Sequence, residues 1–168
     1  MNFTKSLVPF MLNLGVTMVC NCTKYSAPLR TMQDVEERCN RRDQIERHLI
    51  HITSESSGWT SVLKCRKCGA FWAKEYPFSE YHGGGQACLY RIYTADPNQW
   101  LDKESGLTDR LRQVQEDRDF FESLGDEVGP ETCKHESCRS KRVKNSVMCR
   151  HHHFFMIQGR EYSHENGK

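Results

Sequence analysis

Hydrophobic residues recur at helical spacing in two parts of the chain. In TMQDVEERCNRRDQIERHLIHI (31–52) apolar positions lie three to four residues apart, and Thr31 precedes Asp34 by three residues, as in a capping box. This pattern predicts one helix or two short helices over 31–52. The segment LTDRLRQVQEDRDFFESLG (107–125) repeats the spacing and ends at Gly125, which predicts a further helix.

Between these segments lie three runs of strand length, rich in aromatic and β-branched residues: WTSVLK, AFWAKEY and ACLYRIYT. CRKCG separates the first two runs, and PFSEYHGGGQ separates the second from the third. Short connections of this kind favour an antiparallel meander, covered by the first helix. The expected fold class is therefore α+β: an N-terminal helix packed on a small antiparallel sheet, a second helix, and a small C-terminal module.

Composition and charge divide the chain further. Its 168 residues allow one domain, or a small domain with an appendage. The formal net charge is only +2, but residues 101–131 carry −6 and residues 133–160 carry +6. The expected organisation is an N-terminal extension, an α+β domain, an acidic helix with a linker, and a basic C-terminal module, at residues 1–30, 31–100, 101–130 and 131–168.

The N-terminal run KSLVPFMLNLGVTMVC has the size of a signal-peptide apolar region. However, large residues, Met18 and Val19, precede Cys20, where a signal peptidase prefers small ones. The run is also too short to span a bilayer. We therefore expect a poorly ordered extension rather than a processed signal, a lipid anchor or a membrane span.

The cysteines favour metal binding over disulfides. There are nine, an odd number that cannot form a complete intramolecular set, so a reducing, cytoplasmic location is expected. In the tail they form Cys133-x4-Cys138-x10-Cys149-x2-His152. Two close pairs separated by a loop supply the four ligands of a tetrahedral zinc site. His153 and His135 are alternative fourth ligands, because three consecutive histidines, 151–153, point in different directions.

CRKCG contains a second, weaker metal signal. Cys65 and Cys68 can share one metal, and Gly69 permits a turn with positive φ. Cys88 and His82 are the expected further ligands; Cys39 and the closely spaced pair at 20 and 22 are alternatives. A reduced hairpin turn without metal remains open. A redox role is disfavoured because CxxC here joins two strands instead of opening a helix.

The basic residues of the tail allow a second function. Their functional interpretation is a phosphate-contacting patch on a zinc finger, which would make the protein a nucleic-acid-binding regulator. Their other interpretation is a solvated face that pairs with the acidic helix before it, since the two charges cancel. The candidate nucleic-acid contacts are Arg139, Lys141, Arg142 and Lys144.

The HGGG sequence at 82–85 is the remaining unusual feature. A lipase-type oxyanion hole would need a Gly-x-Ser-x-Gly elbow, which the sequence lacks. A phosphate loop would lead into a helix, whereas this one leads into a strand. Backbone with positive φ, or close approach to another surface, is the third interpretation.

Metal-dependent hydrolysis is also disfavoured, because cysteine-rich sites with four ligands are closed to water.

Two resemblances add to this picture. Over about 40–95, the order Trp59, GAFW, YPFSE, HGGG and a leucine strand resembles a small bacterial immunity-protein family of polymorphic toxin systems. The tail is similar to small Cys3His zinc repeats of plant proteins, which usually have glycine where this chain has Ser137. The first resemblance implies a non-enzymatic domain that binds a protein partner such as a toxin. Its implied partner contacts are Glu80, His82, Gly83, Gly84 and Gly85.

Overall fold

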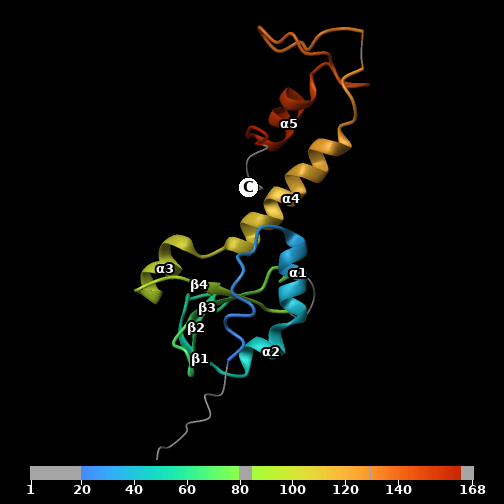
Figure 1. Cartoon of the computed structure of the whole chain (residues 1–168). Helices are drawn as coiled ribbons and strands as arrows, with labels where there is room; N and C mark the ends of the chain where they lie inside the picture. Colours follow the sequence, from blue (N-terminus) through green and yellow to red (C-terminus); the bar gives the residue numbers. More distant parts are fainter. Residues whose placement is uncertain (1–19, 80–84, 129, 164–168) are drawn as a thin grey trace, which may run out of the picture.

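The computed structural model describes residues 20–79, 85–128 and 130–163 (Figure 1). Its sheet has four antiparallel strands in the order β1-β2-β3-β4. The strands are β1 (Leu49–Ser54), β2 (Ser61–Cys65), β3 (Phe71–Glu75) and β4 (Cys88–Ile92). The helices are α1 (Met32–Asn40), α2 (Arg42–Glu46), α3 (Pro97–Glu104), α4 (Leu107–Ser123) and α5 (Arg150–Gln158). The predicted α+β class and the antiparallel meander are confirmed.

Two elements differ from the prediction. The helical pattern extends to residue 52, but the chain leaves the helix after α2, and β1 pairs with β2 from Leu49↔Cys65 to Ser54↔Ser61. Pairing with a hydrophobic neighbouring strand therefore overrides the helical spacing there. The other element is α3, which was not predicted. Asp96 caps it by accepting hydrogen bonds from the N–H groups of residues 98 and 99, and Pro97 occupies its first turn.

The sheet is covered on both faces. Side chains alternate along each strand, so Val62, Ala73 and Tyr90 face one side while Leu63, Trp72 and Leu89 face the other. The first side packs against α1, α3 and the start of α4. The second packs against α2 and the segment of residues 20–25 that precedes α1. From residue 20 onward, the N-terminal segment is thus part of the core rather than a loose extension.

Helix α1 begins where the capping box predicted. The Asp34 N–H donates to Thr31 Oγ1 at 3.2 Å, and the Asp34 carboxylate accepts from the Thr31 N–H at 2.9 Å. Reciprocal bonds of this kind satisfy N–H groups that the helix itself leaves free. Val35 and Cys39, one turn apart, then point into the core.

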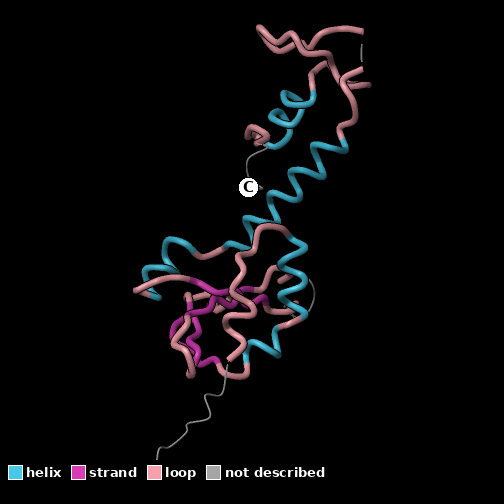
Figure 2. Tube along the Cα trace, in the orientation of Figure 1, coloured by secondary structure: helices cyan, strands magenta, loops and turns pink. Residues whose placement is uncertain are grey.

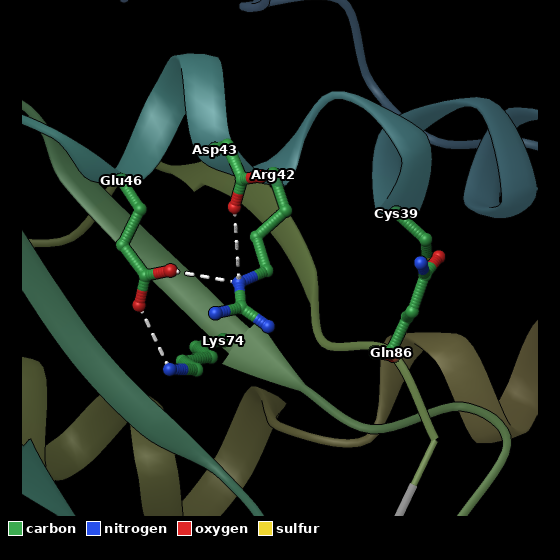
Figure 3. A network of polar contacts seen from close by, with 6 residues as sticks. All are labelled: Cys39, Arg42, Asp43, Glu46, Lys74 and Gln86. Atoms are coloured by element: carbon green, nitrogen blue, oxygen red, sulfur yellow. Dashed lines mark hydrogen bonds and ion pairs between the residues drawn. The ribbon is translucent and has the colours of Figure 1, made fainter.

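An ion-pair network joins α2 to the sheet (Figure 3). The Glu46 carboxylate accepts from Arg42 Nε and from Lys74 Nζ, each at 2.8 Å. Because Lys74 lies on β3, the carboxylate links a helix to a central strand. The same view labels Cys39 of α1 and Gln86, which lie close together, and the Cys39 thiol lies 3.9 Å from the backbone carbonyl oxygen of Gln86.

Helix α4 leads away from the sheet toward the C-terminal module, where α5 packs beside it (Figure 2). Phe154 of α5 is fully buried, and its ring contacts Phe120, Phe121 and Tyr162. Helix α5 therefore includes both the three histidines and the apolar residues that follow them. Across residues 20–79, 85–128 and 130–163, none of the helices has the length and apolar character needed to cross a membrane.

Candidate metal centres

The C-terminal module is a small knuckle closed by backbone pairing. Thr132 and Lys141 form an isolated antiparallel bridge, and the Cys133 N–H donates to the Ser140 carbonyl at 2.9 Å. The chain then returns to Cys149, which is the N-cap of α5. The Cys149 sulfur accepts a hydrogen bond from the backbone N–H of His152 at 3.5 Å, so the first turn of the helix fixes Cys149 and His152 relative to each other.

This fold brings one histidine and three cysteines together. The ligand atoms of Cys133, Cys138, Cys149 and His152 all lie within 4.8 Å of one another. The Cys138 and Cys149 sulfurs are 3.9 Å apart, and His152 Nδ1 lies 3.1 Å from Cys149 Sγ. Tetrahedral zinc with ordinary bond lengths requires sulfur–sulfur distances of about 3.8 Å and sulfur–nitrogen distances of about 3.6 Å. The sulfur–sulfur distance matches this geometry, while the sulfur–nitrogen distance is shorter, so the group can accommodate one tetrahedral ion after a small shift of the imidazole.

The other histidines have different environments. His135 stacks on the ring of His152 at 3.8 Å, and His151 packs edge-on against Phe121. Burial lowers the pKa of His152, and the neighbouring His135 lowers it further. A neutral imidazole is the form that binds metal, so this environment favours coordination by His152.

Ser137 takes the conformation that glycine would take easily. Its φ is +65°, in the left-handed region. In the small Cys3His repeats that the tail resembles, this place usually holds glycine, which takes such a conformation without strain. The knuckle thus has the turn with positive φ even though the residue at this position is serine and not glycine.

A second group lies at the edge of the sheet. The sulfurs of Cys20, Cys22, Cys65 and Cys68 are all within 4.8 Å of one another. Cys65 ends β2, Cys68 lies in the turn before β3, and the other two come from the N-terminal segment. The predicted positive φ of the CRKCG turn is present at Gly69, where φ is +74°. In the part of the chain that the structure describes, two groups could therefore hold a metal ion.

Cys88 does not lie with this second group. Alternation along β4 places it on the opposite face, where its sulfur contacts the Val35 carbonyl and neighbours Cys39. The expectation that Cys88 completes the CRKCG site is corrected in favour of the pair at residues 20 and 22. The other expected ligand, His82, lies outside the described residues.

The thiols of the second group strongly influence one another. Burial raises the pKa of Cys22, and the neighbouring thiols of Cys65 and Cys68 raise it further. Burial also raises the pKa of Cys65, but the backbone N–H groups of Cys68 and Lys67 outweigh this effect and bring it down to about 7. One thiolate is thus readily formed, while further ionisation needs a compensating positive charge.

The glycine loop is described only in part. Glu80, His82, Gly83 and Gly84 lie outside the described residues, so their predicted partner contacts stay predictions. Gly85 has φ of +64°, and a Cβ there would lie 2.6 Å from the Phe78 carbonyl oxygen. At this position glycine is required both by conformation and by close approach of backbone, as the third interpretation of HGGG predicted.

Several basic residues of the tail pair with acids. Arg142 binds Glu131 at 2.8 Å, Arg150 binds Asp126 at 3.5 Å, and Arg160 pairs with Asp117 of α4. The remaining candidates for nucleic-acid contact, at 139, 141 and 144, are exposed. Charge in this module is therefore partly neutralised within the chain.

Together, the fold and the two groups define a small α+β protein with two sites suited to a metal ion. Comparison with protein families gives a match of residues 32–93 to the family model described as Immunity protein 27. This segment contains α1, α2 and the whole sheet, and it covers less than half of the chain. The chain is therefore similar to that family over this segment. Neither the curated proteins nor the solved structures gave a match.

Proposed function

We propose that this protein is a non-enzymatic, immunity-like protein that binds and neutralises a protein partner of toxin type. The match of residues 32–93 to Immunity protein 27 carries the proposal. The matched segment contains the sheet and its N-terminal helices, which is the part that would form the binding domain. The sequence motif ending in HGGG lies within the same segment, so its proposed contacts, Glu80, His82 and Gly83 to Gly85, belong to that domain.

An aromatic surface beside this motif supports partner binding. Trp59 is 48% exposed, although tryptophan is a residue that folding normally buries. Its ring packs edge-on against Tyr76, with centroids 5.6 Å apart. Both rings line a depression of about 300 Å³ that also includes Glu55, Ser79 and Asp109. Exposed tryptophan and tyrosine are typical anchors of protein interfaces.

Zinc in the C-terminal module is part of the proposal. Three thiols and one imidazole with tetrahedral spacing form a donor set that zinc prefers over magnesium or calcium. The site has four protein ligands and leaves no position for a reacting water, which supports a structural role. Cys133, Cys138, Cys149 and His152 would then hold the module together, because it is too small to fold on a hydrophobic core alone.

The test uses the proteins encoded by the genes that flank this one as probes, and we expect one of them to arrest growth when it is expressed alone. We expect co-expression to restore growth and the two chains to form an isolable complex. Substitution Trp59→Ala should weaken binding by at least about tenfold, the loss typical of a central aromatic anchor, and should leave the unfolding midpoint nearly unchanged.

Tyr93→Ala is the matched control, because Tyr93 is also an exposed aromatic side chain, at 76%, but lies outside the depression. It should bind like the unmodified chain. Absence of both protection and complex would reject the proposed function. Equal losses for the two variants would reject this surface as the binding site.

A further inference from the structure

We propose that Cys20, Cys22, Cys65 and Cys68 form a second zinc centre, which fastens the N-terminal segment to the sheet. The four sulfurs come from two chain segments more than 40 residues apart, yet all lie within 4.8 Å of one another. Two of them, on Cys22 and Cys65, belong to buried residues. A convergence of four thiols at one point is the geometry of a structural four-cysteine zinc site.

The tight Cys-x-Cys spacing is accommodated by a turn. The Tyr25 N–H donates to the Asn21 carbonyl at 3.3 Å, and the Asn21 side chain donates to the Gln44 carbonyl at 3.3 Å. These bonds curl the segment over the end of β2, so that residues 20 and 22 both direct sulfur toward the CRKCG turn. The strand alternation that would separate such a pair does not apply within a turn.

The surroundings supply hydrogen-bond donors to sulfur. Backbone N–H groups of Lys67 and Cys68 point at Cys65, and that of Ala70 points at Cys68. The indole N–H of Trp72 is fully buried, has no hydrogen-bond partner and lies near Cys22. Four thiolates around a divalent ion retain negative charge, and such donors stabilise that charge.

The donor set also selects the metal. It consists only of sulfur, whereas magnesium, calcium and manganese prefer oxygen. Zinc is the common ion for a tetrahedral four-sulfur site without redox chemistry. The four ligands close the coordination sphere, so the centre has a structural role.

As a consequence, the attachment of the N-terminal segment to this face of the sheet depends on metal. Besides the centre, the segment is held by Tyr25, whose hydroxyl donates to Gln44 at 2.5 Å, and by Arg38, which donates to the carbonyls of residues 25 and 27. Beneath it lie Trp72 and Leu89, both fully buried. Without zinc, the crowded thiols have no common partner, and the segment should detach more readily from this face.

Zinc stoichiometry of the full chain, measured by native mass spectrometry after expression with zinc, tests the centre. We expect two ions per chain. The pair Cys65→Ser and Cys68→Ser should retain one, and the pair Cys133→Ser and Cys138→Ser should also retain one. Cys39→Ala removes a thiol outside both groups and should keep two. The proposal would be overturned if the full chain bound one ion and the chain with Cys65→Ser and Cys68→Ser still bound one.

A second measurement covers the case in which the Cys65 and Cys68 variant fails to fold. Lys24 and Arg30 are exposed trypsin sites in or next to the fastened segment. In the Cys133→Ser and Cys138→Ser chain, zinc should protect both sites, and a chelator should increase their cleavage rate at least tenfold. Equal rates with and without chelator, or a zinc-free mass lowered by the four hydrogens of two disulfides, would overturn the proposal. Neither readout depends on a toxin.

Discussion

At Gly85 two separate constraints act on one residue. Its φ is positive, and the carbonyl of Phe78 fills the space in which a side chain would begin. Gly58 has a similar φ of +78° but open space around the position of a Cβ. Substitutions at Gly58 and Gly85 therefore distinguish the cost of a positive φ from the cost of steric overlap.

We expect Gly58→Ala to lower the free energy of unfolding by about 1 kcal/mol, the cost of left-handed backbone for alanine. Gly85→Ala should cost more, about 3 kcal/mol, because the Cβ would meet backbone that cannot easily move. Urea unfolding of both variants in zinc-containing buffer measures the difference. Equal losses would show that the contact with Phe78 is relieved without cost.

Residue-scale reasoning from sequence was strongest where one residue type has one physical role. The glycine at 69 was expected to have positive φ, and it does. Ser137 was noted only as a departure from the glycine of similar zinc repeats, and sequence alone does not show whether the turn is kept. The structure shows that it is, because the surrounding knuckle holds serine at φ +65°.

At the scale of elements, Glu75 joins β3 to the start of α4. Its carboxylate is buried and accepts from the Tyr90 hydroxyl at 2.6 Å, the Gly106 N–H at 2.8 Å, and both the N–H and hydroxyl of Thr108. Burial and the adjacent carboxylate raise the pKa of Tyr90, so its hydroxyl stays protonated as a donor. The negative charge also lies at the positive end of the helix dipole.

Glu75→Gln should therefore lower the free energy of unfolding by about 2–3 kcal/mol. The amide loses the charge and turns one acceptor into a donor that faces other donors. Thermal or urea unfolding measures this loss. Glu104→Gln, at an exposed position of α3, is the control and should change stability by less than about 0.5 kcal/mol. If both variants unfold alike, the carboxylate does not hold α4 to the sheet.

The elements missed from sequence share a reason. Residues 49–54 continue an apolar spacing that suits a short helix as well as a strand, and only pairing with β2 decides between them. The start of α3 carries a local signal in Asp96 followed by Pro97, but its eight residues are too few to show a repeated helical spacing. The long, strongly periodic α4 and the aromatic strands needed no such tertiary information.

At the scale of the whole molecule, acids of the acidic segment 101–131 pair with the basic module. Arg160 pairs with Asp117 of α4, while Arg150 and Arg142 pair with Asp126 and Glu131, which follow the helix. The candidate patch for nucleic acid is then reduced to the exposed residues 139, 141 and 144.

We therefore expect weak binding to duplex DNA, with log K falling against log salt with a slope of about −3 or shallower, because about three phosphates could be neutralised. Fluorescence anisotropy between 50 and 200 mM salt, approximate conditions typical of such titrations, gives the slope. A chain with Arg139, Lys141 and Lys144 all changed to Ala is the control. Submicromolar binding with a much steeper slope would favour the nucleic-acid function instead.

The two metal-capable groups were predictable to different degrees. All four members of the C-terminal group lie within 20 residues, so their spacing alone suggests a common ligand. For the N-terminal group, only Cys65 and Cys68 were evident as a pair. The other two come from a segment more than 40 residues earlier, and nothing local distinguishes them from Cys88 or Cys39, which the strand order places elsewhere.

This difference in ligand spacing has a consequence for the order of folding. The C-terminal centre closes a loop of about 20 residues, from Cys133 to His152, whereas the N-terminal one closes about 49, from Cys20 to Cys68. Loop closure alone differs by less than about 1 kcal/mol, but the second centre also needs β2 and the turn before β3 in place. If both groups bind zinc as proposed, the tail would capture its ion as a local event, whereas the other group would capture an ion only as the sheet assembles.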